Sequence, residues 1–275
     1  MLGSKGWYTV AARRVEGATV NVQEVLALYD EQQRIAIEYP EARKETLPGL
    51  VRFVRPAPGM NFVSYSRLAA ADLDAAIAEQ VAFFRPLGQS FSWKVCAHDQ
   101  PPELEPHLVL HGFAPGDSDP VMALDLRETP PALLAPVAAD VRRIERREQL
   151  ESVIAIMERV WGGDFGWMRR RLGDHLDIPG YLGMHVAYAD GQPACAGWVY
   201  FYPGSQFAGL FGGSTLPEHR KRGLYTAVLA ARVQEAIRRG YRFLTIEASA
   251  MSRPIVAAHG FQVLTYARDY EWQGG

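Results

Sequence analysis

The sequence has few cysteines and no long hydrophobic run. Its only two cysteines, Cys96 and Cys195, have no CxxC spacing, so neither a disulfide framework nor a zinc motif is indicated. Both lie in apolar, strand-like runs, where a cysteine usually acts as a small buried side chain. No stretch reaches the roughly 18 apolar residues of a membrane span, and the first residues lack the apolar segment of a secretory signal. We therefore expect a cytoplasmic protein.

The chain also lacks an excess of either charge. With 29 basic and 31 acidic residues the formal net charge is −2. A chain of this charge has no general attraction for nucleic acid or for an anionic membrane, so any basic site must be local. Its length of 275 residues and its 48% hydrophobic content are typical of a soluble globular protein with two domains.

A proline-rich segment divides the chain. Residues 127–139 contain three prolines and little hydrophobic periodicity, which predicts a linker between residues 1–126 and residues 140–275. On both sides of it, helical and strand-like segments alternate. This order predicts an α+β fold with mixed sheets and helices on both faces.

The two halves can be overlaid when Gly88 is matched to Gly240, an offset of 152 residues. Ile77 then falls on Leu229 and Phe91 on Phe243. Each half later contains the tripeptide His-Gly-Phe, at 111–113 and 259–261. Tandem copies of one fold explain the shared order.

The most informative segment is GGSTLPEHRKRGLYTAVLAARVQEAIRRG, residues 212–240. A strand leads through a basic loop, which contains Arg220, Lys221, Arg222 and Gly223, into a helix with an apolar face. The first turn of a helix has unpaired N–H groups and the positive end of the helix dipole, so it attracts phosphate. Glycine lets the backbone approach the anion closely. The pattern therefore predicts an anion site.

Over residues 140–272 the sequence resembles the GNAT superfamily of N-acetyltransferases. The order strand, P-E-x-R-x-R-G, helix, strand, short helix, G-F, strand is the pattern of that family. Its phosphate signature, Gln/Arg-x-x-Gly-x-Gly/Ala, corresponds to residues 220–225, with Tyr225 at the last position. The resemblance implies that acetyl-CoA binds as co-substrate, its pyrophosphate on the loop amides and its pantetheine arm along the preceding strand. The implied cofactor residues are Ser214, Thr215, Leu216, Arg220, Lys221, Arg222, Gly223, Leu224, Tyr225 and Thr226.

The N-terminal half lacks this signature. At the 152-residue offset Leu68 replaces Arg220 and Ala71 replaces Gly223. Asp72 and Asp74 fall in the first helical turn, where their charge would repel a pyrophosphate. The first half is thus expected to be a degenerate GNAT-like domain without a phosphate loop.

The catalytic residues are less clear from the sequence. Family members commonly use a carboxylate as base and a tyrosine as acid, and the usual position of that tyrosine holds Val256 here. Glu247 is the nearest base, although it could equally be an exposed strand residue or an ion-pair partner. Ser249 and Ser252 could hydrogen-bond the thioester or the thiol, or serve as turn and cap residues. Tyr270 and His259 are weaker candidates.

Two further patterns have alternative explanations. His107 and His111 have the i, i+4 spacing of a metal pair, but no third ligand is evident, so we expect no metal. Asp164, in the sequence WGGDFGW, is a candidate to attract an amine or part of an ordinary packed loop.

The leading hypothesis is an acyltransferase that moves an acetyl group from acetyl-CoA to a primary amine of a small molecule or peptide. The alternative is a non-catalytic acetyl-CoA-binding or sensing protein on the same scaffold. A nucleic-acid partner is disfavoured by the overall charge. We expect no membrane partner, and either a monomer or a homodimer.

Overall fold

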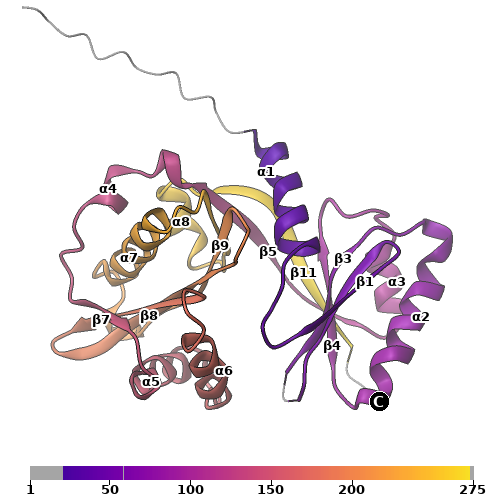
Figure 1. Cartoon of the computed structure of the whole chain (residues 1–275), viewed down its shortest axis with the longest axis horizontal. Coiled ribbons are helices and arrows are strands. Elements are labelled where there is room, and N and C mark those ends of the chain that lie inside the picture. The colour runs from indigo at the N-terminus through magenta and orange to yellow at the C-terminus, as the bar shows by residue number, and fades with distance from the viewer. Residues whose placement is uncertain (1–20, 58, 273–275) are drawn as a thin grey trace, which may run out of the picture.

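The computed structural model describes residues 21–57 and 59–272. Their strands form a single sheet of eleven strands in the order β1-β2-β3-β4-β11-β5-β10-β9-β8-β7-β6 (Figure 1). The strands are β1 (Arg43–Leu47), β2 (Leu50–Val54), β3 (Asn61–Ser66), β4 (Phe91–Cys96), β5 (Ala114–Asp125), β6 (Val141–Ile144), β7 (Leu182–Ala189), β8 (Gln192–Phe201), β9 (Phe207–Thr215), β10 (Phe243–Glu247) and β11 (Gln262–Trp272). The α-helices are α1 (Val22–Tyr29), α2 (Leu73–Phe84), α3 (Leu104–Leu110), α4 (Pro131–Leu134), α5 (Leu150–Trp161), α6 (Trp167–Leu176), α7 (Leu224–Arg238) and α8 (Arg253–Ala258).

The same order of elements occurs twice. In the N-terminal half β3 is followed by α2, β4, α3 and β5, and in the C-terminal half β9 is followed by α7, β10, α8 and β11. Each half contains one parallel strand pair, β3 with β4 and β9 with β10, joined by its long helix. The tandem α+β architecture predicted from the sequence is confirmed, with helices on both faces of the sheet.

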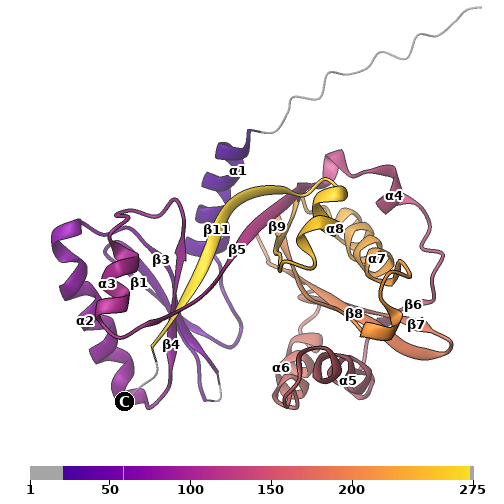
Figure 2. The same cartoon turned by 180° about the vertical axis from the view of Figure 1, so that it is seen from behind.

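The two halves exchange their last strands. β5 follows the N-terminal half in the chain but pairs with β10, and β11 follows the C-terminal half but pairs with β4. The two exchanged strands also pair with each other, and they run as long ribbons between the halves in both views (Figures 1 and 2). The predicted division at residues 127–139 therefore separates the two halves along the chain. That each half is an independent domain stays a prediction.

The exchange has a local two-fold symmetry. Asp119 of β5 lies opposite Ala267 of β11, and adding 148 to residue 119 gives 267. At the same offset the pair Ala114 and Glu271 maps onto the pair Gln262 and Ala123. Paired in this way, the two domains contact each other like the subunits of a strand-swapped dimer.

One detail of the sequence overlay is wrong by one residue. Phe91 stacks on Phe84 of α2, with ring centroids 4.3 Å apart, whereas Phe243 stacks on Phe207, on the face opposite α7. Since neighbouring strand residues face opposite ways, the offset of 152 that fits the helices must become 153 in β4 and β10. Phe91 then corresponds to Leu244, which packs with Leu229 and Val233 of α7.

The predicted linker is packed rather than loose. It contains α4, whose Leu133 is fully buried, and Gln234 of α7 donates hydrogen bonds to the carbonyls of Leu133 and Ala135 at 2.9 and 2.8 Å. The strand β1 was not anticipated, because its sequence RKETL is charged and only partly buried. Among the described residues, no helix is long and apolar enough to cross a membrane.

Candidate active site

The centre of the C-terminal half is a gap between two parallel strands. β9 and β10 are paired from Phe207 opposite Phe243 to Gly209 opposite Thr245, and then they separate. The register of β9 with β8 shifts beyond Phe211, which marks a β-bulge at Gly212 and Gly213. Gly212 has a φ of +62°, and a Cβ there would lie 1.8 Å from the Trp198 ring. Glycine is required at this point.

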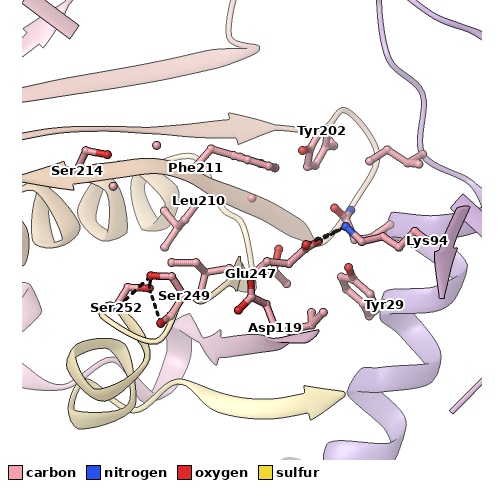
Figure 3. Close-up of a pocket in the computed structure, with 18 of the residues that line it drawn as sticks. Tyr29, Lys94, Asp119, Tyr202, Leu210, Phe211, Ser214, Glu247, Ser249 and Ser252 are labelled. Atoms are coloured by element: carbon pink, nitrogen blue, oxygen red, sulfur yellow. Dashed lines mark hydrogen bonds and ion pairs between the residues drawn. The ribbon is translucent and has the colours of Figure 1, made fainter. Parts of the chain in front are cut away.

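A cavity of about 460 Å³ lies in this gap. Its walls include Leu210 and Phe211 on β9 and Glu247 on β10, and Figure 3 shows Glu247 between these residues and Tyr29 of α1. Both halves of the chain contribute, since Lys94 and Asp119 come from β4 and β5.

The predicted phosphate loop adjoins a second cavity of about 560 Å³. Gly223 is the N-cap of α7 with a φ of +76°, and Lys221 also has a left-handed conformation, with a φ of +60°. Within the described residues no side chain caps this helix, so its first N–H groups remain available. The residues that line this cavity include eight of the ten implied cofactor residues: Ser214, Thr215, Arg220, Lys221, Gly223, Leu224, Tyr225 and Thr226.

The other two implied residues face elsewhere. The Leu216 side chain is buried in the core between the sheet and α5. Arg222 lies 3.4 Å from the carboxylate of Asp190 and 2.9 Å from Nδ1 of His219. The backbone of these two residues belongs to the loop, but their side chains do not line the cavity.

Tyr225, the departure from the family signature, lies where the two cavities meet and lines both. Its ring packs beneath the bulge, so that a Cβ on Gly213 would lie 2.8 Å from a ring carbon. The hydroxyl is buried with no hydrogen-bond partner among the described residues, and burial raises its pKa. The ring therefore packs under β9 and does not block the first turn of α7.

Glu247 faces the central cavity and forms an ion pair. Both of its carboxylate oxygens accept hydrogen bonds from Nζ of Lys94, at 2.6 and 2.8 Å, as Figure 3 shows. Burial by itself would lower the pKa of Lys94, but Glu247 and Asp269 outweigh it and the pKa is raised. Lys94 and Glu247 occupy corresponding positions of the two halves, since adding 153 to 94 gives 247.

A second carboxylate and two serines complete the cavity. Burial, and then the charges of Glu247 and Asp117, raise the pKa of Asp119. Ser249 and Ser252, placed beyond the end of β10, lie with their hydroxyl oxygens 3.2 Å apart. Both serines line the two cavities, so they lie near the point where these join.

Several wall residues were not predicted from the sequence: Tyr29, Lys94, Asp119, Trp161 and Tyr202. Lys94 carried one signal, because it is one of only four lysines and interrupts an apolar strand. Trp161 donates a hydrogen bond from Nε1 to Oγ of Ser214 at 2.8 Å, which positions it between the cavities.

The remaining candidates lie elsewhere. Asp164 is exposed and accepts a hydrogen bond from the backbone N–H of Gly166 at 2.7 Å, so it orders the loop before α6. His107 and His111 both pair with the carboxylate of Asp74, at 2.8 and 2.9 Å. These three residues belong to the N-terminal half and lie at α2 and α3.

Comparison with known proteins agrees with this geometry. Residues 147–261 match the model of the acetyltransferase (GNAT) family. Among solved structures, the chain is similar to a GCN5-related N-acetyltransferase from Kribbella flavida, with a TM-score of 0.70 and 16% identity over 92% of this chain and 96% of that one. It is also similar to a tandem GNAT protein from the clavulanic acid biosynthesis pathway, with a TM-score of 0.61 and 15% identity over 92% and 95%.

A conserved protein from Staphylococcus epidermidis ATCC 12228, described as functionally unknown, has a TM-score of 0.63 at 12% identity over 86% of this chain and 96% of that one. No curated protein matches the sequence. The chain thus contains a GNAT-family domain at residues 147–261 and, as a whole, has the tandem GNAT fold.

Proposed function

We propose that this protein transfers an acetyl group from acetyl-CoA to a primary amine of a small molecule or peptide. The observation that carries the proposal is the continuity of the two cavities. The uncapped N-terminus of α7 and the gap between β9 and β10 share Trp161, Gly213, Ser214, Tyr225, Ser249 and Ser252 as walls. A phosphate at the helix and a thioester in the gap would thus lie along one passage.

The cofactor end is held mainly by backbone. The free N–H groups at the start of α7 suit the pyrophosphate, and Arg220 and Lys221 add charge beside them. The helix dipole contributes only about 0.3–1 kcal/mol, whereas each hydrogen bond to a charged group contributes about 1.5–3 kcal/mol. The loop geometry therefore matters more than the dipole. Beyond Gly209, β9 no longer pairs with β10, so its backbone groups are available to the pantetheine arm.

In the reaction, the neutral amine attacks the thioester carbonyl carbon, and the C–S bond breaks. The proton lost by the nitrogen passes to Glu247, our proposed base, and the departing thiolate takes up a proton to give CoA. We propose that Ser249, which lines both cavities, hydrogen-bonds the thioester or the thiol. Orientation of the two substrates supplies much of the acceleration, up to about 7–11 kcal/mol in favourable cases.

The alternative is an acetyl-CoA-binding protein without turnover. It is favoured by the ion pair that engages Glu247 and by Val256, fully buried where family members commonly carry a tyrosine. In that case the cofactor pocket would bind normally and no thiol would be released.

A panel of amines with acetyl-CoA and detection of free thiol tests the proposal. We expect thiol release that depends on the amine, and calorimetry should count one acetyl-CoA per chain. Binding without release for every amine would favour the alternative. A stoichiometry of two would contradict the degenerate N-terminal half.

A further inference from the structure

A third cavity, of about 360 Å³, opens from the central cavity on the side away from the phosphate loop. The two share Tyr29, Gln33, Tyr39, Lys94, Tyr202, Phe211 and Glu247 as walls. It lies between the two halves, with α6 and β8 on one side and β3 and β4 on the other. An acceptor that reaches Glu247 from this side would meet the thioester from the opposite direction.

This third cavity, which we call the acceptor cavity, is rich in aromatic side chains. Its tyrosine, phenylalanine and tryptophan side chains come from both halves. Neighbouring rings pack together, and the ring centroids of Tyr181 and Tyr200 lie 5.2 Å apart. The aromatic walls are Tyr29, Tyr39, Phe62, Trp167, Tyr181, Trp198, Tyr200, Tyr202 and Phe211. Such walls favour a flat, apolar body.

The charges at one end of the cavity do not balance. Arg55 and Arg171 line it, and within the described residues both form their ion pairs with Glu41 alone, at 3.2 and 3.0 Å. Glu41 also accepts a hydrogen bond from His175. One carboxylate thus faces two guanidinium groups.

The guanidinium groups are also incompletely paired. The Nε atoms of Arg55 and Arg171 are buried without a hydrogen-bond partner among the described residues, and the Arg55 side chain is only 10% exposed. Burial, and next the charge of Arg171, lower the pKa of Arg55. An added anion would relieve the repulsion between these two groups.

The other charges of the cavity are balanced or acidic. Arg34 is paired with Asp30 and Asp99, and Lys94 with Glu247. Glu247 and Asp269 therefore make the end beside the central cavity the acidic one. The cavity is bipolar, with carboxylates near the gap in the sheet and an excess of arginine at the far end.

From this arrangement we infer that the acceptor is a zwitterionic amine: its amino group faces Glu247, its oxyanion faces Arg55 and Arg171, and an apolar body fills the aromatic walls. An amino acid whose amino and carboxylate groups lie at opposite ends of an aromatic body, such as 4-(aminomethyl)benzoic acid, has this chemistry. The inference rests on the proposed function for the reaction, but the preference of the cavity for a zwitterion can be measured without turnover.

The test compares 4-(aminomethyl)benzoic acid and 4-(2-aminoethyl)benzoic acid with their amides and with benzylamine, and adds 4-(aminomethyl)phenylphosphonic acid to separate carboxylate from phosphonate. We expect the acid to bind at least about tenfold more tightly than its amide by calorimetry. Arg171→Gln should remove this difference and leave binding of benzylamine and of acetyl-CoA unchanged. Arg170→Gln, an exposed neighbour on α6, is the matched control and should change nothing.

Equal binding of acid and amide, or binding of no member of the acid series, would overturn the inference. So would an Arg171→Gln variant that weakens acid and amide alike, since that indicates damage to the cavity instead of loss of an anion contact. A preference for the acid without thiol release would reject the transferase and keep this inference. Thiol release without a preference for the acid would support the transferase and overturn this inference. A preference for the phosphonate over the carboxylate would keep the zwitterion and identify its anion.

Discussion

The two halves of this protein share an order of elements but differ at the gap between their parallel strands. In the C-terminal half Gly213 and Ile246 line the open central cavity. The corresponding residues of the N-terminal half are Ser66 and Trp93, at offsets of 147 and 153, and there Nε1 of Trp93 donates to Oγ of Ser66 at 3.1 Å. Trp93 is fully buried and fills the gap. Trp93 and Ser66 thus close the gap in the first half, whereas Ile246 and Gly213 leave it open in the second.

The helices that follow the two gaps, α7 and α2, also differ at their first turns. The first turn of α7 has an uncapped N-terminus beside Arg220 and Lys221, whereas the first turn of α2 has Asp74. Hydrogen bonds from His107 and then His111 lower the pKa of Asp74, so its carboxylate stays charged. We therefore propose phosphate binding only at the start of α7, since the charge of Asp74 would repel phosphate at the start of α2. The N-terminal half instead supplies strands, Lys94 and part of the walls of the acceptor cavity.

The largest expected effect breaks the phosphate loop. Gly223→Glu should weaken acetyl-CoA binding by about a thousandfold or more, because the new carboxylate would face the free N–H groups and oppose several hydrogen bonds of about 1.5–3 kcal/mol each. Calorimetry measures the dissociation constant of acetyl-CoA for the variant and the parent. Gly223→Ala, which adds only the strain of a left-handed residue, should have a much smaller effect.

The matched control is Ala71→Glu, at the corresponding position of the N-terminal half, where the added charge should leave binding unchanged. If Gly223→Glu binds as tightly as the parent, the loop is not the phosphate site.

The next effect concerns Trp93, which closes the gap between β3 and β4. Trp93→Ala should lower the free energy of unfolding by about 3–5 kcal/mol, because it leaves a cavity in the core of the N-terminal half and removes the partner of Ser66. Denaturant unfolding measures this loss, and acetyl-CoA should still bind with one site per chain. A second site in this variant would mean that Trp93 alone keeps the N-terminal half from binding the cofactor.

A third prediction distinguishes the roles of Lys94 and Glu247 in turnover, since these two residues form one ion pair. Glu247→Gln removes the proposed base and should lower kcat by about a hundredfold, with acetyl-CoA affinity unchanged. Lys94→Met breaks the same ion pair but keeps the carboxylate, so kcat should fall less. Equal losses in the two variants would show that Glu247 acts through the pair and not as a base.

The smallest effect is a pH dependence specific to the C-terminal half. Burial lowers the pKa of His185 from its ordinary 6.5 to about 4, despite the nearby carboxylate of Glu235. The unfolded chain therefore binds the extra proton between pH 6.5 and 4, and the contribution of His185 to stability is lost as the pH falls through this window. Unfolding measured against pH should show a shallower slope there for His185→Gln.

The sequence by itself determined the order of the elements, the repeat and the position of the loop that we propose as the phosphate site. These depend on local signals: an apolar face on α7, a glycine at its N-cap and a basic loop before it. The charged strand β1 was missed because it lies at the edge of the sheet and shows no alternation of buried and exposed residues.

Only the tertiary structure decided how the halves are joined and what faces the site. Strand pairing joins residues far apart in the chain, so no local pattern indicated that β5 and β11 exchange places, or that Lys94 would reach Glu247. The face of a strand residue also reverses with a shift of one position, which the 152-residue overlay could not detect. Asp119, Tyr29 and Arg55 belong to the N-terminal half, and they reach the site only because the sheet is continuous.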